Sequence, residues 1–268
     1  MYFTYEPVGV GISTLAERAI AASPVPHRSR PDPDAPDWRT VSELCDPSAW
    51  REIGRRYFHS LGTPHAAPGR LCSLQHYAGR ALGLMVAAWC ADGTLLHPGH
   101  DRWWAFIDQT GSTLEVSLPG TATLGREQDP SALVDNIRRH IYPLVYACVE
   151  AGNVTRRAAL GGVAASCAGA FGAAHRTVRA QRRLAVETDA DLVSCAFSDR
   201  PLVKIIRLDD PPALVHDRHT CCLIRLGSAR SECGSCPQIS EEQRRARQQQ
   251  RQRRRQQEPG RAVTESVR

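Results

Sequence analysis

The sequence predicts an α+β fold that is mainly helical, with a small antiparallel sheet and a cysteine-rich loop near the C-terminus. Three observations support this prediction. Apolar residues recur at helical spacing over several long segments. Two short segments, 103–108 and 113–118, have strand-like composition and flank a turn over residues 109–112, which predicts a hairpin. Four cysteines fall within 16 residues near the C-terminus: Cys221, Cys222, Cys233 and Cys236.

Length and composition exclude several classes of protein. The chain has 268 residues, of which 42% are hydrophobic and 23% charged, as in ordinary globular proteins. A chain of this length can bury a core without disulfide bonds. The mean hydropathy of −0.36 argues against a polytopic membrane protein. The Ala- and Gly-rich run 158–174 is poor in Leu, Ile and Val, so we expect a buried helix there rather than a membrane span.

Composition divides the chain into four parts. Residues 1–37 form an N-terminal arm, with a short helix expected over Val10–Ala22 and then a polar linker that contains five prolines. Residues 38–214 form an α+β body, residues 215–240 carry the cysteines, and residues 241–268 form a basic low-complexity tail. We expect the tail to be a solvated helix as far as Gln257 and to be disordered beyond Pro259.

Within the body, periodicity predicts helices over Ala49–Leu61, Leu71–Cys90 and Ala132–Ala151. Ser131 is the expected N-cap of the third helix, and Pro143 is expected to kink it.

A further helix, or a pair of helices, is predicted over 156–184. A strand is predicted over Leu202–Leu208, and we expect it to join the antiparallel sheet formed around residues 95–120. Residues 209–212 are expected to be a loop that leads to the cysteines.

The four clustered cysteines have the pattern C-C-x10-C-x2-C, which indicates a metal site. Cys233 and Cys236 form a C-x2-C chelate, and Gly234 allows its tight turn. Cys221 and Cys222 are adjacent, so their side chains would point to opposite faces of an extended strand and could not easily share one tetrahedral zinc ion.

A two-iron two-sulfur cluster relaxes this constraint, because each of its two irons takes two thiolates. The sequence therefore favours an iron–sulfur cluster over zinc, with a disulfide pair or unreactive thiols as the remaining alternative. Since no signal peptide is recognisable at the N-terminus, we expect a cytoplasmic protein, in which disulfides are rare.

The segment from Arg218 to Leu223, followed by Cys233-Gly234-Ser235-Cys236, resembles the C-terminal signature of the FhuF-type ferric-siderophore reductases. A looser similarity extends over residues 100–214, where the Gly- and Ala-rich helix resembles the small-residue helix of that family. The resemblance implies that the protein is an oxidoreductase that acts on metal ions. It also implies that Cys221, Cys222, Cys233 and Cys236 hold a two-iron two-sulfur cluster.

The partners implied by this resemblance are a ferric siderophore, an external electron donor and an inner-membrane siderophore importer. The donor would be a ferredoxin or a flavin- or NAD(P)H-dependent reductase, because the sequence contains no P-loop and no GxGxxG motif. We expect the protein to work in the cytoplasm, with peripheral contact at the inner face of the membrane. One electron releases the iron, because ferrous iron binds the hard oxygen ligands of a siderophore much more weakly than ferric iron.

Two alternative functions remain open from the sequence. The first is an iron–sulfur sensor whose basic tail contacts nucleic acid, although no recognition helix is evident in the body. The second is a structural zinc-binding protein without a redox role.

Several other residues are functional candidates. Arg225 and Arg230 with His216 and His219 are expected to form either an electropositive rim or an ordinary solvated loop. The six other cysteines are expected to be small buried hydrophobes.

Overall fold

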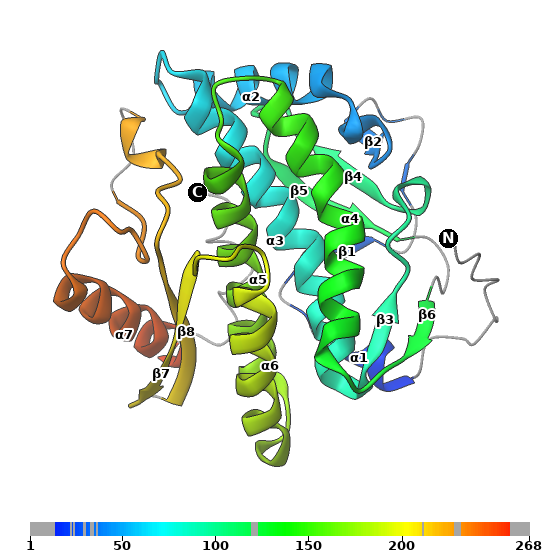
Figure 1. Cartoon of the computed structure of the whole chain (residues 1–268), viewed down its shortest axis with the longest axis vertical. Coiled ribbons are helices and arrows are strands. Elements are labelled where there is room, and N and C mark those ends of the chain that lie inside the picture. Colours follow the sequence, from blue (N-terminus) through cyan, green and yellow to red (C-terminus); the bar gives the residue numbers. More distant parts are fainter. Residues whose placement is uncertain are drawn as a thin grey trace.

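The computed structural model describes residues 14–21, 23, 25–28, 31–32, 35, 37–118, 123–210, 212–227 and 232–257. Over these residues the fold is α+β and mainly helical, as predicted (Figure 1). Short 3-10 turns complete it, at Glu43–Cys45, His100–Arg102, Ala180–Arg182 and Ile224–Leu226. The expected N-terminal helix is α1, Thr14–Ala21, and residues 10–13 of that prediction lie outside the described residues.

Helices α2 and α3 form an antiparallel hairpin early in the body. Helix α2 spans Pro47–Ser60 and is capped by Asp46, whose carboxylate accepts a hydrogen bond from the Ser48 backbone. Helix α3 spans Ala66–Asp92 and starts five residues before the predicted position. Its Pro68 lies in the first turn, where proline costs no helical hydrogen bond. The helix ends at Gly93, which takes the left-handed conformation with φ of 80°.

Helices α4, α5 and α6 complete the helical layer (Figure 1). Helix α4 spans Pro130–Glu150, and its N-cap is Asp129 rather than the predicted Ser131, because Pro130 occupies the first helical position and Asp129 accepts from the Ser131 backbone. The helix continues through Pro143. The segment 156–184, predicted as one helix or a pair, contains one α-helix, α5, Arg156–Thr177, and a 3-10 turn, Ala180–Arg182. Helix α6, Arg183–Cys195, begins at the end of that segment and lies mostly beyond it.

Helix α5 is the one described helix that is long and apolar enough to cross a membrane. In this fold it packs against α3, α6 and β8, and 78% of its most apolar stretch is buried inside the protein. Its small side chains allow these close contacts, as expected for the core helix of a soluble protein. The sequence-based expectation of a buried helix is therefore supported.

The strands form three small sheets rather than one. The first has the order β1–β5–β4–β2, with β1 (His27–Arg28) parallel to β5 and the other pairs antiparallel. Its central hairpin, β4 (Trp104–Ile107) and β5 (Thr113–Ser117), is the predicted one, and β2 spans Trp38–Thr40. A second sheet pairs β3 (Thr94–Leu96) with β6 (Thr123–Arg126).

The third sheet corrects the sequence prediction. Strand β7, Val203–Asp209, does not join the sheet around residues 95–120 but forms a separate hairpin with β8, Pro212–Arg218. Strand β8 was not predicted. Exposed and buried residues do not alternate along this strand, because α5 packs against it and α7 also contacts it. This hairpin leads directly into the cysteine segment, which we define as residues 219–240.

Helix α7, Glu241–Gln257, follows the cysteine segment and extends to the last of the described residues (Figure 1). It is not fully solvated, because Gln248 and Gln252 are buried. The part of the predicted tail beyond Gln257 lies outside the described residues.

Candidate metal centre

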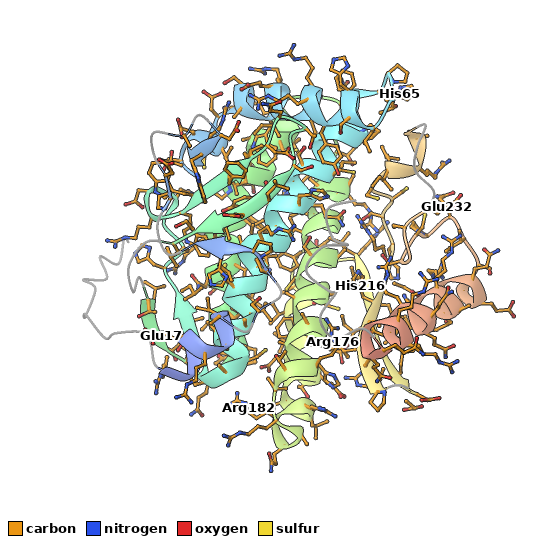
Figure 2. All side chains as sticks on the ribbon, turned by 180° about the vertical axis from the view of Figure 1, so that it is seen from behind. Glu17, His65, Arg176, Arg182, His216 and Glu232 are labelled. Atoms are coloured by element: carbon orange, nitrogen blue, oxygen red, sulfur yellow. The ribbon has the colours of Figure 1, made fainter. Side chains whose placement is uncertain are left out.

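The cysteine segment lies between the end of β8 and the start of α7, beside the N-terminal half of α3 (Figure 1). Its Cys222 packs into a small apolar cluster with Tyr57, Leu61 and Cys72. Figure 2 shows the molecule from behind and labels Glu232 of the cysteine segment and His216 of β8. The site is therefore anchored on the body of the fold rather than carried on a separate appendage.

The four predicted ligands are brought together as two contacting pairs of thiols. Cys222 interacts with Cys233, and Cys221 interacts with Cys236. The thiols of Cys233 and Cys236 are close enough to influence each other electrostatically, which links the two pairs. All four cysteines are free thiols in this structure. The adjacent cysteines 221 and 222 therefore interact with different thiols, Cys236 and Cys233 respectively.

The backbone turns sharply after the adjacent cysteines. Leu223 adopts the left-handed conformation with φ of 63°, which is uncommon for a residue with a branched side chain. This turn lets the Leu223 N–H donate to the Cys221 sulfur at 3.3 Å. A strained backbone at this point is consistent with a site that must orient two neighbouring side chains differently.

In the C-x2-C turn, each cysteine sulfur accepts a hydrogen bond from the backbone N–H of the residue two positions later. Ser235 donates to Cys233, and Gln238 donates to Cys236. Such hydrogen bonds stabilise the thiolate form and tune the potential of a metal bound to it.

The thiols influence one another's protonation. The Cys233 side chain acts to lower the pKa of Cys222, but the Cys72 thiol and burial raise it, and the net result is a pKa of about 11. The pKa of Cys233 is raised by its hydrogen bond with Cys222 and by burial, and that of Cys236 is raised mainly by burial. A metal that binds here therefore has to displace protons from these sulfurs.

Arg218 places a buried positive charge beside the thiols. Its side chain is on the last residue of β8, is only 3% exposed, and donates from Nη1 to Gln75 Oε1 on α3 at 2.7 Å. Its Nε and Nη2 are buried and have no hydrogen-bond partner among the described residues. The positive charge acts to lower the pKa of both Cys222 and Cys233.

The buried charge of Arg218 limits the kind of group that the site can hold. An unpaired buried cation is costly unless a negative charge compensates it. A cluster held by four thiolates is an anion, so the donor set and Arg218 together fit a two-iron two-sulfur centre. In the part of the chain that the structure describes, no three His, Cys, Asp or Glu side chains are gathered closely enough to hold a single metal ion.

Two neighbours of the site were missed by sequence reasoning. Cys72 of α3, expected to be an ordinary buried hydrophobe, donates to the Cys222 carbonyl at 3.7 Å and contacts its thiol. Thr220 is buried against Gly161 of α5, where any side chain on the glycine would collide with it. A single cysteine or glycine in a helix carries no signal of such long-range contacts.

Helix α7 holds the base of the site through Asp217 of β8. This buried carboxylate forms ion pairs with Arg244 at 3.2 Å and Arg245 at 3.4 Å, and it accepts from Gln248 at 3.1 Å. Arg244 also donates to the carbonyl oxygen of Cys236 at 3.3 Å. The basic residues at the start of the predicted tail are therefore structural contacts of the cysteine segment.

The predicted electropositive rim is only partly formed. His219 donates from Nδ1 to the Pro201 carbonyl at 2.9 Å, and Arg225 is exposed. The backbone oxygen of His216 accepts from Gln248 on α7. Arg230 lies outside the described residues.

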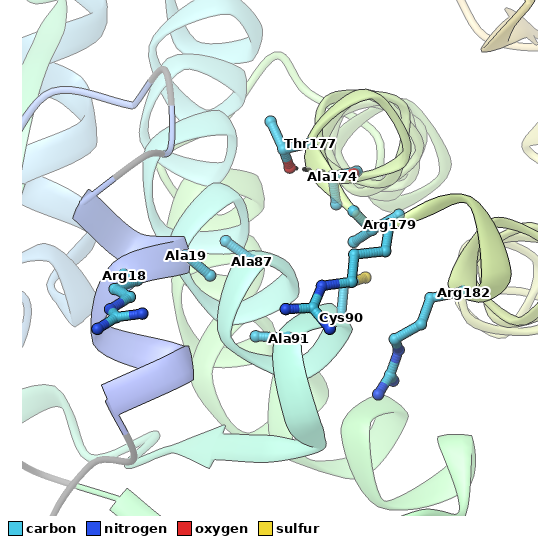
Figure 3. Close-up of a pocket in the computed structure, with 10 residues that line it drawn as sticks. Arg18, Ala19, Ala87, Cys90, Ala91, Ala174, Thr177, Arg179 and Arg182 are labelled. Atoms are coloured by element: carbon cyan, nitrogen blue, oxygen red, sulfur yellow. Dashed lines mark hydrogen bonds between the residues drawn. The ribbon is translucent and has the colours of Figure 1, made fainter.

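Two cavities open on the described surface. One, of about 480 Å³, lies between α1, α3 and the end of α5, with Arg18, Arg179 and Arg182 around a floor of alanines (Figure 3). It reaches Ala87 of α3, about 22 Å along the helix from Cys72. The other cavity, of about 440 Å³, borders the cysteine segment at Pro237.

A scan against models of known protein families found no match to this chain, and a search of curated proteins found none either.

Proposed function

We propose that the chain is an iron–sulfur ferric-siderophore reductase. The observation that carries this proposal is the meeting of four thiols as two interacting pairs beside the buried guanidinium of Arg218, whose Nε and Nη2 have no hydrogen-bond partner among the described residues. The resemblance of the cysteine motif to the FhuF-type family supports the same function. This support comes from the motif alone, because no family model matches the chain.

In this proposal Cys221, Cys222, Cys233 and Cys236 hold a two-iron two-sulfur cluster. Such a cluster, when bound, supplies one electron at a time. The chain's own residues hold it and set its environment. Leu223, Ser235 and Gln238 donate backbone hydrogen bonds to sulfur. Arg218 contributes positive charge, which favours the more negative, reduced state.

The overall reaction balances with one electron. The ferric chelate accepts an electron and becomes a ferrous chelate, no bond of the chelator breaks, and the weakly held ferrous ion dissociates. The electron comes from an external donor, a ferredoxin or a flavin- or NAD(P)H-dependent reductase. We place this reaction in the cytoplasm, where the chelate would arrive through an inner-membrane importer.

A structural zinc protein is the second candidate, because the Cys233–Cys236 chelate alone is typical of zinc sites. A sensor with a nucleic-acid-binding tail receives less support. Arg244 and Arg245 are engaged with Asp217, and Arg247 donates to the Glu232 carbonyl, so much of the basic charge near the start of α7 already has a protein partner.

An anaerobic iron-release assay tests the proposed reaction. The protein is reduced, freed of excess reductant and mixed with a ferric siderophore, and ferrous iron is trapped with a ferrous-specific chromophoric chelator. We expect one ferrous ion for each reduced centre, with Cys195→Ser, which changes an exposed cysteine on α6, as an active control. A reduced protein that stays reduced in the presence of ferric siderophores would rule out the reaction.

A further inference from the structure

The larger cavity lies at the opposite end of α3 from the cysteine segment and is separate from the candidate metal centre. Its volume is about 480 Å³, which is in the range of pockets that bind small molecules. Helix α3 contributes Ala87, Cys90 and Ala91, α5 contributes Ala174, and α1, which packs against α3, contributes Ala19. The space remains open because these helices present short side chains where they meet.

Three arginines surround this apolar floor. Arg18 comes from α1, and Arg179 and Arg182 come from the turn that follows α5. All three side chains are exposed to solvent. In Figure 3, Arg179 extends toward the alanines of α3, with Arg18 and Arg182 on either side of it. The cavity therefore has a positively charged mouth above an apolar floor.

Nearby acidic residues compensate only part of this positive charge. None of the three guanidinium groups forms an ion pair or a side-chain hydrogen bond with another described residue. Asp189 of α6 acts electrostatically on Arg182, and its carboxylate accepts a hydrogen bond from Trp89 Nε1 at 2.8 Å. Glu17 of α1 is exposed and does not line the cavity. If Asp189 is counted against Arg182, two positive charges remain at the mouth.

We propose that this cavity binds a phosphate monoester whose ester group is apolar. A guanidinium binds phosphate oxygens through paired hydrogen bonds, and two remaining positive charges match the charge of about −1.5 to −2 on a phosphate monoester at neutral pH. The alanine floor would hold the apolar group, because inorganic phosphate alone would leave that surface exposed to water. The inference goes beyond the proposed reductase function and does not rest on it.

Octyl phosphate, kept below the concentration at which it forms micelles, is a simple probe of this chemistry. Its binding to the full-length protein is measured by calorimetry, beside that of inorganic phosphate and of 1-octanol. We expect octyl phosphate to bind at least about tenfold more tightly than either, since burial of about two methylene groups accounts for a factor of ten. No measurable binding of octyl phosphate, or an affinity equal to that of either comparison ligand, would overturn the proposal.

Variants then assign the binding to this cavity. Arg179→Gln removes an exposed charge at the mouth and should weaken octyl phosphate binding about fivefold to tenfold. Ala87→Leu fills part of the floor without changing the charge and should weaken binding at least about fivefold. Arg200→Gln removes an exposed charge outside the cavity and is the matched control. Undiminished binding in Arg179→Gln or Ala87→Leu, or an equal loss in Arg200→Gln, would overturn the proposal.

Vesicles distinguish a soluble ester from a lipid headgroup as the source of the phosphate. Cosedimentation of the protein with phosphatidylcholine vesicles is compared with and without phosphatidic acid, whose headgroup is a phosphate monoester. Binding that requires phosphatidic acid and is lost in Ala87→Leu would identify the lipid as the ligand. Octyl phosphate binding without such vesicle binding would identify a soluble ester. Vesicle binding that persists in Ala87→Leu, with no binding of octyl phosphate, would show attraction of surface charge alone and overturn the proposal.

Discussion

Single contacts made by small residues position the cysteine segment. Gly161 of α5 allows Thr220, the residue before Cys221, to lie directly on the helix backbone. The neighbouring Gly162 has more room, since the nearest atom to an added Cβ would be Gln75 Cβ at 3.7 Å. The two glycines therefore differ in what a methyl group would meet, although they are adjacent in the same helix.

Gly161→Ala should lower the free energy of unfolding by about 1–3 kcal/mol, because Thr220 has to move away from the helix. Gly162→Ala should leave it unchanged or raise it by up to about 1 kcal/mol, since alanine favours the helix. Urea denaturation of the two variants measures this difference. Equal effects would mean that Thr220 does not pack on α5 as described.

His140 is a second residue whose environment has a measurable consequence. Its Nδ1 donates to the Pro98 carbonyl at 3.0 Å, so its Nε2 is left to accept from the Tyr77 hydroxyl at 2.7 Å. Burial, against a smaller opposing effect of the Pro98 hydrogen bond, lowers the pKa of His140 to about 3. The folded protein therefore keeps this imidazole neutral under conditions in which the unfolded chain would protonate it.

The sign of the pH effect follows from this lowered pKa. The stability that His140 contributes is fully present above pH 6.5 and is lost as the pH falls from there toward 3, by about 1.4 kcal/mol per pH unit. His140→Gln should reduce the slope of unfolding free energy against pH between 6 and 4, measured by urea denaturation. His59→Gln, at an exposed position on α2, should keep the slope of the parent. An unchanged slope in His140→Gln would contradict the buried neutral imidazole.

At the scale of elements, α7 holds the candidate metal centre in place. Its side chains satisfy the buried Asp217 of β8, the carbonyl of Cys236 and the carbonyl of Glu232. Helix and cysteine segment are therefore expected to be stable together.

Truncation after Ser240 should lower the free energy of unfolding by about 3 kcal/mol, the scale expected when a buried ion pair loses its partner. Truncation after Gln257 keeps every contact named above between α7 and the cysteine segment, so it should have no comparable effect. Thermal or urea unfolding of both truncated proteins measures this contrast. Similar stability of the two proteins would show that α7 does not brace the site.

The elements also show how far sequence patterns reach. Local patterns predicted helices α2, α3, α4 and α5 and the β4–β5 hairpin. They failed where a distant partner decides the structure. Strand β8 is covered on both faces and has no clean alternation, and Asp129 competes with Ser131 for the N-cap because a proline separates them.

At the scale of the whole molecule, the candidate centre depends on packing between distant segments. The four cysteines were identified from their spacing alone, and the structure brings them together in pairs. The sequence could not show that Arg218 is buried with no ion-pair partner among the described residues, nor that Cys72 contacts Cys222. Both facts depend on how α3 packs against the end of β8.

The most direct test of the proposed metal centre is the metal content of the anaerobically purified protein. We expect two irons and two acid-labile sulfides per chain, with visible absorption that bleaches on addition of dithionite. Cys233→Ser should lose or alter this spectrum, whereas Cys195→Ser should keep it. A protein that instead carries one zinc, or that takes up no iron and sulfide on anaerobic reconstitution, would contradict the iron–sulfur centre and the reductase function built on it.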